Sequence, residues 1–181
     1  YNHYFNPMIS SRSYMTVAPV DLYLDPIALR QGYVSVVNQA EVPNALHIQD
    51  SGMVPVCTEI AIVNPETRKI CKEGEFGEIW VCSEANLTAF TNGPKGPVDH
   101  FAQTQFRGVI ADGNPDVTYL RTGDLGFLYN VSITKNKSSN SNGGASGGGG
   151  GGGEADGEIT TFQPLFVLGK IADTFEVMGL H

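Results

Sequence analysis

Hydrophobic and polar residues alternate over short stretches of the chain, and turn-forming residues separate these stretches. The pattern is clearest over residues 57–82, where TEIAIVN and EIWVC predict two strands joined through NPETRKIC and the glycine-bounded EGEFG. Period-two alternation bounded by Gly, Pro, Asn and Asp is typical of strands. Further strands are predicted by YVSVVNQ, NALHIQD and VTYLRTGD, and by PLFVLGK and DTFEVMG with a turn at 169–172.

Helix signals are scarce. DPIALRQG has Asp25 as a candidate N-cap, Pro26 at the first helical position and Gly32 as a stop, which predicts a short helix. DHFAQTQF, residues 99–106, suits either a helical turn or a loop. Closely spaced strands and turns with so little helix predict a mainly β fold with few short helices, either an antiparallel barrel or a sandwich.

A low-complexity segment interrupts the pattern at residues 134–158, with seven consecutive glycines at 147–153. This composition cannot bury a core, so we expect disorder there. LGFLYNVSIT before it and ITTFQPLFVLG after it both predict strands. The segment is therefore predicted to enlarge the tip of a hairpin, at a cost of only about 0.6 kcal/mol per doubling of loop length.

Composition narrows the class of protein. The chain has 181 residues and a formal net charge of −8, which suits one domain and argues against a nucleic-acid partner, since such proteins carry a basic face. No apolar run approaches the roughly 20 residues of a membrane helix, so we expect neither a membrane helix nor a signal peptide in this sequence. The absence of an initiator Met suggests a piece of a longer protein.

Cysteine and histidine patterns give no metal site. The three cysteines form no CxxC pair and the four histidines lie far apart, so no metal ligands are predicted. Cys57 and Cys82 fall in apolar runs and are predicted to be buried. Free cysteines favour a reducing, cytoplasmic location. The alternative for a longer parent protein is a location at the surface of organelle membranes.

The stretch YLRTGDLGF, residues 119–127, is the strongest candidate for chemistry. Gly123 and Gly126 frame Asp124 at the end of a predicted strand, and Arg121 precedes it. On its own the stretch suits two alternatives, a turn held by an Arg121–Asp124 salt bridge or a ligand clamp. A carboxylate accepts hydrogen bonds from two hydroxyl donors, and a neighbouring glycine leaves room for a ligand.

Three motifs in order carry a resemblance to a known family. EIAIVNPETRKICKEGEFGEIWV, YLRTGDLGFL and LFVLGKIADTFEVMG resemble adenylate-forming enzymes, most of all the fatty acyl-AMP ligase-like domains of the Disco-interacting protein family, and the insertion favours a fungal source. The resemblance implies a distorted antiparallel β-barrel subdomain over 1–133, an insertion at 134–158 and a return strand at 159–168. It also implies the hinge and first strand of a C-terminal domain at 169–181.

The resemblance also implies roles for individual residues. Asp124 would accept hydrogen bonds from the ribose hydroxyls of ATP or an acyl adenylate, and Arg121 would support it or meet phosphate. Lys170, Ala172 and Asp173 would lie in the hinge, although GKIAD also suits an ordinary β-turn. Lys170 stands where the family usually has Arg, and Ala172 where it usually has Asp or Lys, which argues against normal domain rotation.

Several parts of an adenylating enzyme are missing from the chain. The phosphate loop, the adenine motif and the C-terminal lysine would lie outside it, so we expect no catalytic residue here and an inactive isolated piece. The parent would use ATP or AMP with magnesium, and a fatty acid or acyl-adenylate, together with the remaining subdomains of the same chain. The alternative is a non-catalytic lipid-binding or protein-interaction module that retains the fold.

Overall fold

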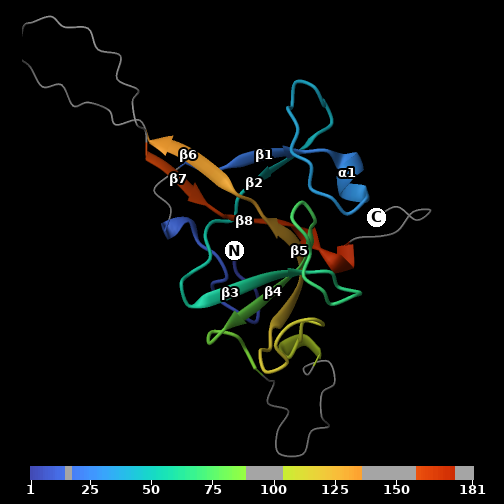
Figure 1. Ribbon diagram of the computed structural model, residues 1–181, viewed down its shortest axis with the longest axis vertical. Helices are drawn as coiled ribbons and strands as arrows, with labels where there is room; N and C mark the ends of the chain where they lie inside the picture. Colours follow the sequence, from blue (N-terminus) through green and yellow to red (C-terminus); the bar gives the residue numbers. More distant parts are fainter. Residues whose placement is uncertain (15–17, 89–103, 136–157, 174–181) are drawn as a thin grey trace, which may run out of the picture.

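A computed structural model describes residues 1–14, 18–88, 104–135 and 158–173 of the chain (Figure 1). Over these residues the structure is mainly strand, as predicted, with the short helix α1, one α-helical turn at 104–106 and short 3₁₀ turns. In chain order the elements are η1 (Arg12–Tyr14), β1 (Asp21–Leu24), α1 (Pro26–Arg30), β2 (Leu46–Gln49), β3 (Thr58–Val63), β4 (Gly77–Ser83), β5 (Leu120–Leu128), β6 (Val131–Lys135), β7 (Glu158–Phe162), β8 (Leu165–Lys170) and η2 (Ile171–Asp173).

The strands form antiparallel sheets rather than one closed barrel. The central sheet has the order β3-β4-β5-β8, and two separate hairpin-like pairs are β1-β2 and β6-β7. A loop covers the outer edge of β8, because Leu165 accepts a hydrogen bond from the Ser51 amide at 2.7 Å and donates to the Gly52 carbonyl at 3.0 Å. An edge covered in this way is protected from pairing with another chain.

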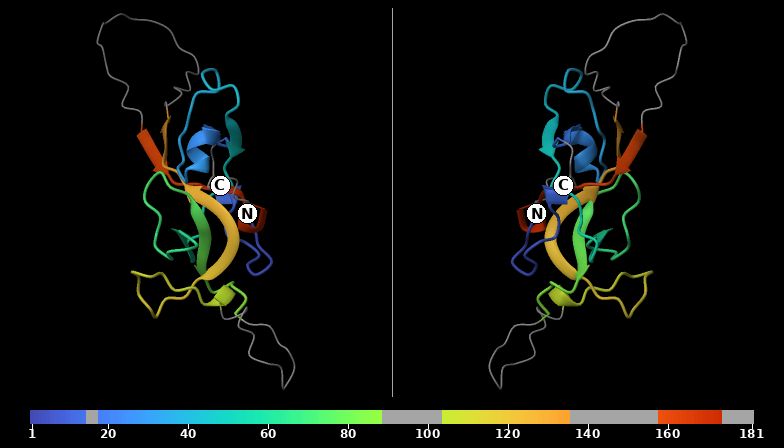
Figure 2. Two further views of the ribbon diagram at one scale, coloured as in Figure 1. Left: turned by 90° about the vertical axis from the view of Figure 1, so that its right-hand side faces the viewer. Right: turned by 90° about the vertical axis from the view of Figure 1, so that its left-hand side faces the viewer.

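Strand β5 is the longest element and pairs with both β4 and β8. Its pairing shifts register between Leu125 and Gly126, and Gly123 has a φ of 71°. Figure 2 shows β5 curved along its length. The expectation that YLRTGDLGF ends a strand in a turn is therefore wrong. The motif lies within the strand, because glycine absorbs the irregular backbone without breaking the pairing.

The core surrounds β4 on both faces. Ile79 and Val81 pack in one hydrophobic cluster, while Trp80 packs in another with Ala61 and Val63. Trp80, the single tryptophan of the chain, is fully buried and serves packing. A strand buried on both faces holds its backbone firmly, and β4 is the strand next to β5.

The residues at the start of helix α1 predicted this helix correctly. The Asp25 carboxylate accepts a hydrogen bond from the Ile27 amide at 2.8 Å, with Pro26 at the first helical position, as predicted. The predicted strand in NALHIQD is β2. The predicted strand in YVSVVNQ is wrong, since Tyr33 and Val36 form only isolated bridges, with Glu75 and Leu24.

Two further expectations differ from the structure. Cys57 is exposed, because it lies in a turn one residue before β3 rather than inside the strand, so its predicted burial is wrong. At the end of the described chain, β8 continues through Lys170 and the 3₁₀ turn η2 follows it. Most of DTFEVMG, the other predicted strand, lies outside the described residues.

The hairpin predicted around the low-complexity segment has well-defined ends. Strands β6 and β7 pair antiparallel, and Lys135 is opposite Glu158. Residues 136–157 lie outside the described residues. The strands that flank the segment therefore leave and re-enter the fold side by side.

Candidate functional site

Strand β5 holds the Asp124 side chain in a nearly closed environment. Asp124 is 7% exposed, and its carboxylate accepts a hydrogen bond from the Tyr1 hydroxyl. The Asp124 amide donates to the Thr122 hydroxyl oxygen at 3.0 Å, and that hydroxyl donates to the Ile79 carbonyl at 2.7 Å. Thr122 therefore fixes the backbone of Asp124 against β4.

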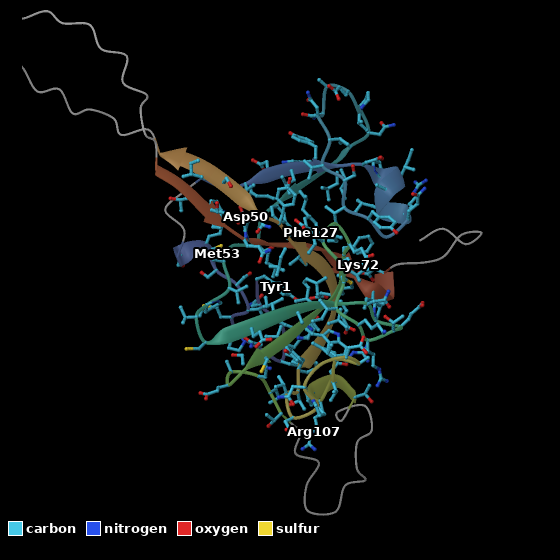
Figure 3. The ribbon with its side chains drawn as sticks, viewed as in Figure 1. Tyr1, Asp50, Met53, Lys72, Arg107 and Phe127 are labelled. Carbon is cyan, nitrogen blue, oxygen red and sulfur yellow. The ribbon has the colours of Figure 1, made fainter. Side chains whose placement is uncertain are left out.

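The N-terminal segment supplies the aromatic groups next to this carboxylate. Burial, followed by the hydrogen bond and charge of Asp124, raises the pKa of the Tyr1 hydroxyl well above its usual value. Burial lowers the pKa of His3, and the Asp124 charge opposes this change only in part. At neutral pH Tyr1 is therefore a protonated hydrogen-bond donor and His3 is neutral. Tyr1 is half-buried, and Figure 3 shows it near the middle of this view.

The structure brings the predicted hinge residues close to Asp124. Lys170 is the residue of β8 that lies opposite Asp124 of β5. Its amino group is 5.8 Å from the centroid of the Tyr4 ring, a cation–π geometry. Ala172 and Asp173 follow in η2, which packs against β5. Asp124 and Lys170 are thus neighbours in the sheet, and Lys170 is an exposed residue at the end of β8.

Arg121 lies on the other face of β5, away from Asp124. Its Nη2 donates to the Glu78 carboxylate at 2.8 Å and its Nε at 3.1 Å, and its guanidinium carbon lies 5.2 Å from the centroid of the Trp80 ring. The Gly123 amide donates to the same carboxylate at 3.1 Å. The alternative of an Arg121–Asp124 salt bridge is therefore wrong, because successive strand residues point to opposite faces.

Sequence reasoning missed the partners of both residues. Glu78 begins an apolar strand and is buried, which in hindsight is the signal that it needs a cationic partner. No feature of the sequence predicts that Tyr1 contacts Asp124, since the two residues are 123 positions apart.

The described ranges contain no cluster of metal ligands and no membrane-spanning helix. Within them, no three His, Cys, Asp or Glu side chains gather as metal ligands would. None of the helices described in the structure has the length and apolar character needed to cross a membrane.

Solved structures with the same fold are adenylate-forming enzymes. A fatty acid AMP ligase from Legionella pneumophila superposes with a TM-score of 0.56 at 26% identity, over 86% of this chain and 20% of that one. A fatty acyl-adenylate ligase from L. pneumophila, solved with acyl adenylate and pyrophosphate, gives 0.57 at 25% identity, over 86% and 20% of the two chains.

Curated relatives include regulatory proteins. The chain is 45% identical over 99% of its length to the Homeostatic regulator of DAG of Saccharomyces cerevisiae, and spans 10% of that protein. It is 29% identical over 74% of its length to Disco-interacting protein 2 of Drosophila melanogaster, of which it spans 7%. No protein-family model matches the chain.

The matched structures define the class, which is the fold of adenylate-forming enzymes in its fatty acyl-AMP ligase-like form. In this chain, most of the YLRTGDLGFL stretch that resembles this class forms β5. The chain belongs to the Disco-interacting protein 2 family, as a segment with this fold, which confirms the family predicted from its motifs.

Proposed function

We propose that this segment forms the ribose-facing wall of an acyl-adenylate site, in a parent protein that activates or binds a fatty acid with ATP. The observation that carries the proposal is the Asp124 carboxylate, which accepts a hydrogen bond from a hydroxyl group in a nearly closed environment. Gly123 next to it has open space where a side chain would stand. A ribose also presents hydroxyl donors to a carboxylate acceptor.

The ribose would replace the Tyr1 hydroxyl. A ribose hydroxyl would take the acceptor position on the Asp124 carboxylate that the Tyr1 hydroxyl occupies. Exchange of one hydroxyl for another conserves the hydrogen bond and costs little. Tyr1 therefore keeps the carboxylate satisfied while the site is empty, at the cost of competing with the nucleotide.

Lys170 would contribute positive charge at the same end of the site. It lies opposite Asp124 in the sheet and is exposed. Attack of a fatty acid carboxylate on the α-phosphate develops negative charge that a nearby cation stabilises. Magnesium and the phosphate-binding parts would come from the parent, and we propose no catalytic residue within the chain itself.

A second candidate function is a non-catalytic lipid-binding or interaction module. Asp124 already has a protein donor in Tyr1, and Ala172 departs from the hinge residue expected for domain rotation. The name of the yeast relative is also regulatory, a homeostatic regulator of DAG. In this case the fold would persist while adenylation is lost.

Calorimetric titration of the full-length parent with a stable acyl-sulfamoyl adenosine tests the ribose role. We expect Asp124→Ala to weaken binding by roughly tenfold to hundredfold, because a charge-assisted hydrogen bond is lost. Asp112→Asn, which changes an exposed carboxylate of the 111–116 loop, is the matched control and should bind like the wild type. Equal binding by the Asp124→Ala variant would refute the proposal.

Product formation separates the two candidates. The wild-type parent is incubated with ATP, magnesium and a fatty acid, and fatty acyl-AMP is measured. Formation of fatty acyl-AMP supports the enzyme, whereas tight binding of the analogue without turnover supports the module. The 181-residue chain alone is expected to be inactive.

A further inference from the structure

A small basic concavity lies on the face of β5 opposite Asp124. Its volume is about 230 Å³, and three arginines, Arg68, Arg107 and Arg121, contribute to its wall. The remaining lining residues are Trp80, Thr104, Gly108 and Val109. Figure 3 places Arg107 at the lower end of the described structure, well away from Tyr1 and the proposed ribose wall.

Within the part of the chain that the structure describes, two of the three arginines have no carboxylate partner. Arg121 is neutralised by Glu78, with Nη2–Oε2 at 2.8 Å. Arg68 and Arg107 are exposed, and within the described ranges their guanidinium groups form neither an ion pair nor a hydrogen bond. Among the described residues, about two positive charges at this concavity are therefore uncompensated, although the chain has a formal net charge of −8.

Backbone contacts hold the two arginine-bearing loops together. The Ala111 amide donates to the Arg68 carbonyl at 2.8 Å, and the Lys69 amino group lies 3.0 Å from the Asp112 carboxylate. Gly108, which follows Arg107, exchanges two backbone hydrogen bonds with Tyr119 at 2.8 and 2.9 Å. The arginines are thus placed by paired backbone, so little loop ordering is needed on binding.

The floor of the concavity depends on a glycine. A Cβ at Gly108 would lie 2.9 Å from the Arg121 Cγ and 2.9 Å from the Trp80 ring. The glycine therefore allows this segment to pack directly on the Arg121 stem and the indole, which keeps the guanidinium groups around one space. Arg121 itself is held in place by its stacking on Trp80 and by Glu78.

The volume of the concavity and its positive charge together indicate the class of ligand. A volume of 230 Å³ corresponds to roughly eight water molecules in the liquid, below the usual range of pocket volumes for a drug-sized ligand. A phosphomonoester carries about −1.5 to −2 charges at pH 7 and offers three oxygens to guanidinium forks. We propose that Arg68, Arg107 and Arg121 form a binding site for a phosphate group, separate from the proposed ribose wall.

The test uses the full-length parent and a matched pair of double variants. Arg68→Gln with Arg107→Gln removes the two uncompensated charges, and leaves Arg121 and Glu78 in place. Arg30→Gln with Lys72→Gln makes the same change of charge at exposed positions outside this concavity. Inorganic phosphate is titrated calorimetrically, and phosphatidylcholine vesicles with and without phosphatidic acid are tested by co-sedimentation.

We expect phosphate to bind saturably, and the Arg68/Arg107 variant to bind it roughly tenfold to hundredfold more weakly, while the control variant binds normally. Vesicle binding that requires phosphatidic acid and is lost in the same variant would identify a lipid headgroup as the source of the phosphate. Binding of free phosphate alone would identify a soluble anion.

Equal binding by both double variants, or no binding of either probe by the wild type, would overturn the proposal. Affinity for the acyl-sulfamoyl adenosine is measured in parallel. It should be unchanged in the Arg68/Arg107 variant, so failure of the phosphate site and failure of the ribose site give different results.

Discussion

Replacing Glu78 with Gln tests whether the buried ion pair under the YLRTGDLGF motif stabilises the fold. The Glu78 side chain is 2% exposed and accepts hydrogen bonds from Arg121 and from the Gly123 amide. Glutamine has nearly the same shape, so the substitution removes the charge without opening a cavity. It leaves the Arg121 guanidinium without its counter-charge.

The expected magnitude follows from the exposure of the two partners. Removing one member of a fully buried pair costs about 3–5 kcal/mol. Arg121 keeps 21% of its side-chain surface in solvent, which relieves part of this penalty. We therefore expect the free energy of unfolding to fall by about 2–3 kcal/mol, a large share of the roughly 5–15 kcal/mol that stabilises a domain.

Urea unfolding, followed by the fluorescence of the single tryptophan Trp80, measures the change. With a urea dependence of about 1–3 kcal/mol per molar, the midpoint should fall by on the order of 1 M. Asp112→Asn is the control, since the Lys69–Asp112 pair is 60% and 70% exposed and should contribute less than about 1 kcal/mol. A loss below about 0.5 kcal/mol in Glu78→Gln would refute the reasoning.

Three further changes test other parts of the fold. Gly126→Ala should lower the free energy of unfolding by about 1–3 kcal/mol, since the new methyl group would collide with the Phe166 carbonyl, and urea unfolding measures it. Asp25→Ala should cost about 1 kcal/mol through loss of the α1 N-cap, measured in the same way. Burial and the adjacent Glu59 carboxylate raise the pKa of Tyr119 to about 12, above the value of 10.0 expected for an unfolded chain. The stability that Tyr119 contributes should therefore be complete below pH 10 and be lost as the pH rises through 12, and absorbance at alkaline pH follows its ionisation.

Each of these predictions has a matched comparison. Gly74→Ala meets open space but has a φ of 83°, so it should cost only about 1 kcal/mol. Asp25→Ser keeps a capping oxygen and should lose less stability than Asp25→Ala. Glu59→Gln should lower the pKa of Tyr119 only in part, because burial is the larger cause. A full return to the ordinary value would contradict that order.

Features set by neighbouring residues were predictable from the sequence. The alternation of TEIAIVN and EIWVC predicts β3 and β4, and Asp25-Pro26 predicts the start of α1, because each depends on residues within a few positions. The ordered motifs also predicted the family. These signals are local, and no competing tertiary contact overrides them.

Features set by contacts between distant residues were not predictable. Glu78 and Arg121 are 43 positions apart, and their pairing depends on the register of β4 and β5. The irregular backbone at Gly123 within β5 was mistaken for a turn, because glycine next to aspartate is typical of both. The strand predicted over YVSVVNQ failed because Tyr33 and Val36 find only single bridging partners, so β propensity alone was not enough.

The pairing of β6 with β7 has a practical consequence. Because Lys135 and Glu158 are directly opposite each other, the two backbones lie roughly 5 Å apart where they leave the hairpin. A folded tag with adjacent termini could be spliced in at this point without pulling the strands apart. For the same reason, length differences between this chain and its relatives should gather here, while the register of β5 and β8 is kept.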